Sequence, residues 1–145
     1  MAVDVTTSTV IDRPVADVAA YAADPSNAPE WYENIASVEW ITPPPLQVGS
    51  KVAFVARFLG RRLEYTYEFI ELTGERLVMQ TAQGPFPMET TYIWAPEGGR
   101  ATRMTLRNRG APAGFATMVT PFMSAAIRRA NRKDLANLKS ILEAS

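Results

Sequence analysis

Two residue types are missing from this chain of 145 residues, which contains neither cysteine nor histidine. Without cysteine there is no disulfide framework and no thiolate nucleophile. Without histidine the chain loses the commonest general base, the commonest metal ligand and every histidine-dependent catalytic triad. Any catalysis would rest on carboxylates, tyrosine, lysine or arginine, and we expect neither a bound metal nor a cofactor.

Net charge and long apolar runs are also missing. The 15 basic residues balance 15 acidic ones, so the composition gives no reason to expect a nucleic-acid partner. No stretch approaches the roughly 20 apolar residues that a membrane-spanning helix needs. The opening MAVDVTTSTV has neither the basic region nor the apolar run of a signal peptide. We therefore expect a cytoplasmic monomer or homodimer without stable membrane insertion.

What the chain does have is enough apolar residues for a core. Hydrophobic residues make up 47% of it and charged residues 21%, which is ordinary for a folded domain. The length fits a single domain. We therefore expect residues 1–145 to form one domain.

Alternation of apolar and polar residues predicts seven strands, separated by turn residues rich in glycine and proline. The expected strands are 3–11, 35–41, 51–59, 62–72, 76–82, 88–95 and 102–108. Turns at roughly ten-residue spacing are typical of an antiparallel meander. Two short helices, 15–23 and 29–32, are expected after the first strand, and apolar residues at helical spacing from Phe115 predict a long C-terminal helix.

That final helix would contain about 30 residues and extend over roughly 45 Å. A one-sided helix beside a curved antiparallel sheet must bury its apolar face against the sheet. The spacing predicts that Phe115, Met118, Phe122 and Ile127 face the sheet. On the opposite side, Arg128, Arg132 and Lys139 should be largely exposed.

Three segments together resemble a known superfamily. They are STVIDRPVADVAAYAADPSNAPEWY at residues 8–32, EGGRATRMTL at 97–106 and DLANLKSILEAS at 134–145. In order and spacing they resemble the SRPBCC or START-like helix-grip superfamily, and within it the bacterial polyketide cyclase/dehydrase-like branch. The resemblance implies an α+β helix-grip fold (Bet v 1-like), with a curved antiparallel sheet of about seven strands around the long C-terminal helix. It also implies an elongated, mostly apolar cavity between them.

The resemblance makes a set of aromatic and methionine side chains into candidate ligand contacts, although the same residues would form the core of a solid fold. The set is Phe54, Tyr65, Tyr67, Phe69, Met79, Tyr92, Trp94, Met104, Phe115, Met118 and Phe122. We expect a pocket between the sheet and residues 115–130, of the roughly 300–1,000 Å³ usual for ligand sites. Tyrosine hydroxyls would orient any polar end of the ligand.

Trp31 and Tyr32 follow Pro29 in the second short helix. In the superfamily this region flanks one end of the cavity, so the pair is a candidate for the cavity mouth. The alternative is that both rings simply pack the helix against the sheet.

Three functions are consistent with these observations. The leading hypothesis is a non-enzymatic carrier or sensor that binds a hydrophobic small molecule, lipid or polyketide-like, inside the cavity. The second is a polyketide cyclase or aromatase in which a tyrosine or arginine assists proton transfer. The third is a toxin-like or regulatory interaction domain whose cavity is incidental. The carboxylates form no recognisable catalytic pair, so no catalytic residue is assigned.

Overall fold

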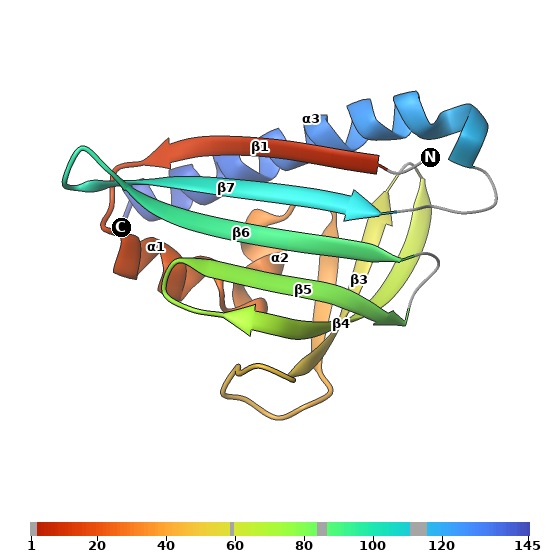
Figure 1. Cartoon of the computed structure of the whole chain (residues 1–145), viewed down its shortest axis with the longest axis horizontal. Coiled ribbons are helices and arrows are strands. Elements are labelled where there is room, and N and C mark those ends of the chain that lie inside the picture. The colour runs from red at the N-terminus through yellow and green to blue at the C-terminus, as the bar shows by residue number, and fades with distance from the viewer. Residues whose placement is uncertain (1–2, 59, 84–86, 111–115) are drawn as a thin grey trace.

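The computed structural model describes residues 3–58, 60–83, 87–110 and 116–145, and for Phe58 and residues 116–121 it describes the backbone alone. A seven-stranded antiparallel sheet curls beside a long helix (Figure 1). The strands are β1 (Val3–Ile11), β2 (Ile35–Trp40), β3 (Lys51–Phe58), β4 (Arg61–Leu72), β5 (Arg76–Gln83), β6 (Met88–Glu97) and β7 (Ala101–Gly110). The helices are α1 (Val15–Ala22), the short 3-10 helix η1 (Pro25–Asn27), α2 (Ala28–Trp31) and α3 (Ala116–Glu143).

The order of the strands in the sheet is β1-β7-β6-β5-β4-β3-β2. Strands β2 to β7 therefore form a meander, and the first strand of the chain pairs with the last. Helix α3 lies behind β1 and β7, α1 lies toward the end of the sheet that holds the β6–β7 hairpin, and α2 is drawn in the middle of the view (Figure 1). This arrangement confirms the expected helix-grip fold.

The hairpin between β6 and β7 sets the register on which the interior depends. Gly98 and Gly99 adopt positive φ values of 63° and 87°. These values lie in the left-handed region, which glycine adopts more easily than other residues. The turn places Trp94 opposite Met104 and, further along the ladder, Thr90 opposite Asn108. Residues directly opposite each other share one face of the sheet, so both pairs point inward.

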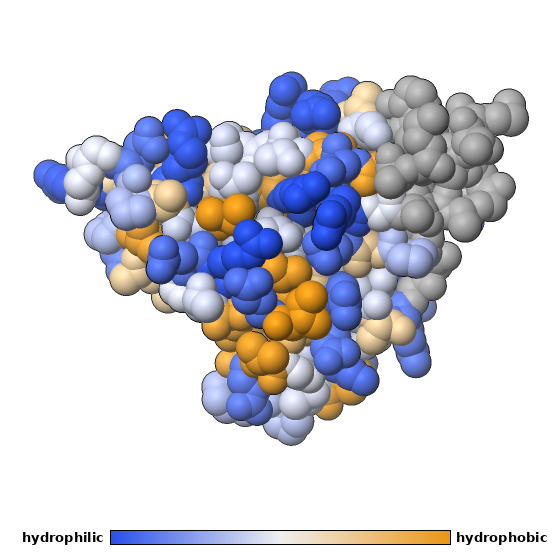
Figure 2. Space-filling view, viewed as in Figure 1, coloured by the Kyte–Doolittle hydropathy of each residue, from blue (hydrophilic) through white to orange (hydrophobic). Residues whose placement is uncertain are grey.

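The other face of the sheet meets water. On β7, Arg103 pairs with Glu97 and Arg107 pairs with Asp4 of β1, at N–O distances of 3.1 and 2.6 Å. The face shown in Figure 2 is largely hydrophilic, with apolar side chains gathering over the lower middle of the view. Polar residues point to water at every second position of these strands, and this alternation explains why the strands could be predicted from the sequence.

The core fills one part of the space between the sheet and α3. Trp94, Met104 and Leu106 of the sheet are almost fully buried, as are Leu135 and Leu138 of the helix. Nearer the start of α3, a second cluster joins Val3, Val5 and Met123. Helix α3 is therefore anchored to the sheet along its C-terminal half and to β1 at Met123.

The expected orientation of α3 is wrong at Phe122. Its side chain is 63% exposed, whereas that of the next residue, Met123, is 4% exposed. Successive helical residues differ by about 100° around the axis, so two adjacent apolar residues cannot both face the sheet squarely. Met123 is the residue that points inward, where it packs with Val3 and Val5 of β1.

The expected exposure of the three basic residues is only partly right. Arg132 is exposed, but Arg128 and Lys139 are half-buried. The Lys139 ammonium donates hydrogen bonds to the Val10 carbonyl at 2.5 Å and to Glu143 at 2.7 Å.

Within the described residues, none of the helices combines the length and hydrophobicity that crossing a bilayer requires.

Candidate ligand-binding pocket

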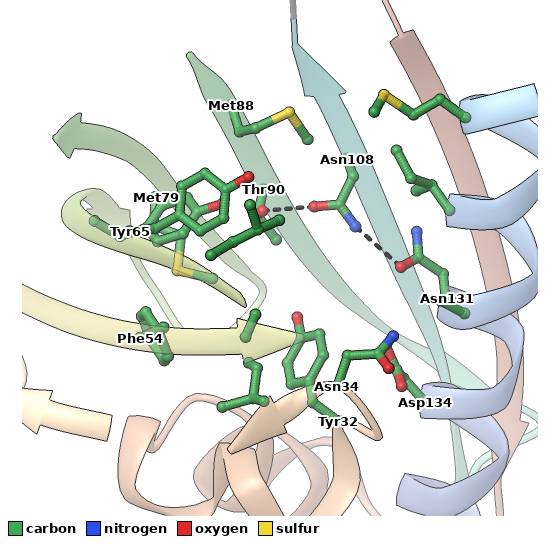
Figure 3. A pocket seen from close by; sticks show the side chains of 17 residues that line it. Tyr32, Asn34, Phe54, Tyr65, Met79, Met88, Thr90, Asn108, Asn131 and Asp134 are labelled. Carbon is green, nitrogen blue, oxygen red and sulfur yellow. Dashed lines mark hydrogen bonds between the residues drawn. The ribbon is translucent and has the colours of Figure 1, made fainter. Parts of the chain in front are cut away.

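A pocket lies between the sheet and the middle of α3, next to the packed core (Figure 3). Its 17 lining residues are Tyr32, Asn34, Ile35, Phe54, Ala56, Leu63, Tyr65, Tyr67, Met79, Met88, Thr90, Asn108, Met123, Ile127, Ala130, Asn131 and Asp134. Its volume is about 160 Å³, which is below the expected range. Three methionines, Met79, Met88 and Met123, are part of the lining, and methionine side chains adapt to fill irregular gaps.

One wall of the pocket is apolar and comes from β3 and β4. Phe54 is directly opposite Tyr65, and Ala56 is opposite Leu63. Each strand contributes every second residue, as the alternation of side chains across a sheet requires. Ile127 and Ala130 complete this lining from α3.

A row of three polar side chains crosses from the sheet to the helix (Figure 3). The Thr90 hydroxyl donates to Asn108 Oδ1 at 2.6 Å, and Asn108 Nδ2 donates to Asn131 Oδ1 at 3.2 Å. The first pair is cross-strand and follows from the β6–β7 register. Asn131 is 4% exposed, and its own Nδ2 has no hydrogen-bond partner.

Asp134 lies one helical turn after Asn131 and is 2% exposed. Its Oδ1 accepts a hydrogen bond from the Glu33 backbone N–H at 2.9 Å. Burial raises the pKa of the Asp134 carboxyl to about 7, and the nearby charge of Glu33 acts in the same direction. The backbone hydrogen bond opposes the shift of the pKa without cancelling it.

Besides the Asn34 side-chain amide, tyrosine hydroxyls supply further polar groups in and next to the pocket. The Tyr32 and Tyr92 hydroxyls lie 2.5 Å apart, and burial holds the pKa of both well above its ordinary value. Burial also raises the pKa of Tyr67, and that of Tyr65 to about 12. All four hydroxyls are therefore neutral near pH 7 and can both donate and accept hydrogen bonds.

The structure divides the expected site residues into groups. Those on the pocket wall are Tyr32, Phe54, Tyr65, Tyr67 and Met79. Phe54 and Met79 also belong to the packed core, together with five residues that do not line this pocket: Trp31, Phe69, Tyr92, Trp94 and Met104. Phe122 is on the solvent side, and Phe115 and the Met118 side chain lie outside the described residues. Ligand contact by the wall residues stays a prediction.

Trp31 is not at a cavity mouth. Its side chain is 1% exposed, and its ring lies 4.1 Å from that of Tyr32 and 5.7 Å from that of Tyr92, between centroids. The alternative of plain helix-to-sheet packing therefore describes Trp31. Tyr32 does reach the pocket, because it follows α2 and its ring turns inward (Figure 3).

The polar lining was missing from the sequence-based candidates. Asn131 follows Ile127 by four residues and Asp134 follows Asn131 by three, which are helical spacings, so the two polar residues interrupt the apolar stripe of α3. Thr90 alternates in phase with Tyr92, and Asn108 with Leu106. These four polar residues could have been identified from the sequence, because each stands at a position where the pattern predicts an inward-facing side chain.

A family model described as "Polyketide cyclase / dehydrase and lipid transport" matches residues 2–143. A search of curated proteins found no match. Among solved structures, a Thermus thermophilus protein aligns with a TM-score of 0.84 and 20% identity, with 97% of each chain covered. The Zhui aromatase/cyclase of a Streptomyces species also gives 0.84, at 13% identity, over 99% of this chain and 94% of that one. A START superfamily protein from Mycobacterium smegmatis gives 0.81, at 12% identity, over 97% of each chain. At these identities, the structural likeness establishes the fold alone.

Proposed function

The chain belongs to the family of polyketide cyclases, dehydrases and lipid-transport proteins, and from this premise we propose that it carries or senses a hydrophobic small molecule in the pocket beside α3. The observation that supports this most is the composition of the pocket wall. Twelve of the 17 lining residues are apolar or aromatic, counting the three tyrosines. Such a wall favours a ligand whose apolar surface is removed from water, at roughly 25 cal/mol per Å² before ordering costs.

The volume of the pocket suits a compact ligand. At about 160 Å³, it is similar to an engineered apolar cavity of about 150 Å³ that binds benzene. A ligand with one ring would fill it, and a longer lipid-like or polyketide-like molecule would place only one end there.

A matched pair of substitutions on α3 tests the proposal. Ala130 lines the pocket and Ala125 is exposed on the same helix. A phenylalanine at position 130 should fill the space that the ligand needs, whereas one at position 125 should project into water. We expect an environment-sensitive apolar probe to bind the parent and Ala125→Phe alike, and Ala130→Phe about tenfold more weakly.

Thermal melts must accompany these titrations, because overpacking costs roughly 1–3 kcal/mol of stability. If folded Ala130→Phe binds the probe as tightly as the parent, the pocket is not the binding site. If the parent itself binds no apolar probe, the proposed function is wrong.

The second candidate is a cyclase-type reaction, and Asp134 is the observation that favours it. The Asp134 carboxyl is buried, lines the pocket and has a pKa of about 7. It can therefore give or take a proton near neutral pH. Under this candidate, the parent should convert a poly-β-ketone chain, and Asp134→Asn should lose the turnover while keeping its affinity for the chain. Equal turnover by both proteins would exclude Asp134 as the acid or base.

A further inference from the structure

The loop between β2 and β3 presents apolar side chains to solvent. Residues 41–50 contain no charged residue and include three prolines, and the loop lies lowest in the view of Figure 1, below β4. The Ile41 side chain is 53% exposed and that of Val48 is 60% exposed. Large apolar side chains exposed together on a projecting loop indicate an interaction surface.

The base of this loop is anchored by other residues. Trp40 and Leu46 are partly buried and pack against the core. The Gly49 N–H donates to the Phe69 carbonyl at 2.7 Å. The same contact places Ile70 of β4, whose side chain is 39% exposed, next to the loop. The loop is therefore held in shape by its inner residues, and its exposed apolar side chains are not needed for that purpose.

The backbone of the loop has few hydrogen-bond donors that need water. Three of its ten residues are proline and have no N–H. At least five of the other seven N–H groups donate within the protein, those of Ile41, Thr42, Gln47, Gly49 and Ser50. An unpaired peptide group is costly in an apolar phase, which offers no acceptor. Satisfied donors are therefore a requirement for contact with lipid, whereas a protein partner can supply acceptors of its own.

The charges near the loop indicate which lipid surface it suits. Lys51 is the only basic residue between positions 36 and 56, and it stands opposite Glu68 in the sheet. Glu71, which follows Ile70, pairs with Arg76 at 3.2 Å. Anionic membranes attract clusters of basic residues, and the sequence places none beside this loop. A stable protein interface needs about 800 Å² from each partner, more than three partly exposed side chains provide.

We propose that the β2–β3 loop, together with Ile70, docks reversibly on the surface of a bilayer of zwitterionic lipids. Ile41 and Val48 would enter the interfacial region, and the rest of the protein would stay in water. A carrier of hydrophobic molecules would have a use for such a surface. The docking itself does not involve the pocket, so the inference goes beyond the proposed function and can be tested separately from it.

The absence of cysteine from the chain allows a single label to report on the loop. Val48→Cys introduces one thiol in the loop, and Phe122→Cys introduces one on α3. The parent side chains at these positions are 60% and 63% exposed, so the two sites are matched in exposure. With an environment-sensitive fluorophore on the thiol, phosphatidylcholine vesicles should shift the emission to the blue at position 48. The label at position 122 should keep the emission that it has in buffer.

Vesicle flotation measures the docking without a label. We expect the parent and Phe122→Asp to partition alike onto phosphatidylcholine vesicles. Val48→Asp should partition about tenfold more weakly, because a charged group resists leaving water with the loop. Added salt or phosphatidylserine should change the partition of the parent by less than about twofold. Ala130→Phe, which alters the pocket, should float as the parent does.

The outcomes separate this inference from the proposed function. A parent that stays in the aqueous phase, or labels at 48 and 122 that respond alike to vesicles, would overturn the inference even if the pocket binds apolar probes. Flotation that requires phosphatidylserine would overturn the choice of lipid surface. A label at position 48 that responds to protein concentration without vesicles would make a second copy the occupant of the loop. A parent that floats but binds no apolar probe would support the docking and refute the proposed function.

Discussion

At the scale of single residues, Asp134 is the one acidic side chain that the structure places in the lining of this pocket. The group is 2% exposed and has one backbone hydrogen bond at Oδ1. Tyr32 and Glu33 are the titratable groups nearest to it in the segment after α2, and neither supplies positive charge. Burial therefore dominates, and the carboxyl holds its proton to higher pH than it does in an unfolded chain.

This shift predicts how stability changes with pH. Between the ordinary pKa of 3.8 and the folded-state pKa of about 7, the folded protein keeps a proton that the unfolded chain has lost. Asp134 therefore favours folding least at high pH, and its contribution falls as pH rises across that range. Asp134→Asn should melt at a higher temperature than the parent at pH 8, and the difference should shrink at pH 5. A difference that is equal at both pH values would contradict the burial of this carboxyl.

Two aromatic residues should respond differently to truncation. Trp94 is 1% exposed and belongs to the core, so Trp94→Ala should cost about 3–5 kcal/mol and lower the melting temperature by about 10 °C. Tyr67 is half-buried and lines the pocket, so Tyr67→Ala should weaken binding of the apolar probe with a smaller loss of stability. Paired melts and titrations check both. A Trp94→Ala protein that melts like the parent yet loses the probe would reverse the two assignments.

At the scale of elements, the strands were predictable because one face of the sheet is exposed to solvent. Arg103, Thr105 and Arg107 alternate with Met104 and Leu106 on β7, so the period of two is plain in the sequence. Alternation shows which face a residue occupies but not how far along the strand the interior is filled. It therefore could not separate the core residue Trp94 from the pocket residue Thr90 on the same face of β6.

Helix α3 was harder to orient because its apolar residues cover more than one side. Phe122 was predicted to face the sheet because it follows Met118 by four residues, but Met123 precedes Ile127 by the same spacing. The choice depends on the contact of Met123 with Val3 and Val5 of β1, a long-range contact that periodicity does not report. The polar lining has the same origin, since Asn131 meets Asn108 only once helix and sheet are in place.

The orientation of α3 is tested by neighbouring alanine substitutions. Met123→Ala should lower the stability by about 2–5 kcal/mol, because it empties space in a buried cluster. Phe122→Ala should change it by less than about 0.5 kcal/mol, as exposed positions usually do. Chemical denaturation of both variants gives the two values. A larger loss at position 122 than at 123 would show that the helix is rotated from the orientation described.

At the scale of the whole molecule, the space between sheet and helix is solid in one part and hollow in the other. Leu135, Leu138 and Leu142 of α3 belong to the core that also contains α1 and α2 residues. Residues 123–134 border the pocket instead, where β3 and β4 curl toward the helix (Figure 1). The short helices fill only one end of the curled sheet, so the other end keeps room for a ligand.

Native mass spectrometry of protein purified from its own host tests this account most directly. We predict that the parent and Ala125→Phe carry the same small hydrophobic adduct, and that Ala130→Phe does not. An adduct retained equally by all three proteins would place the ligand outside the pocket. A bare parent that also fails to bind apolar probes would contradict the claim that this pocket is a ligand site.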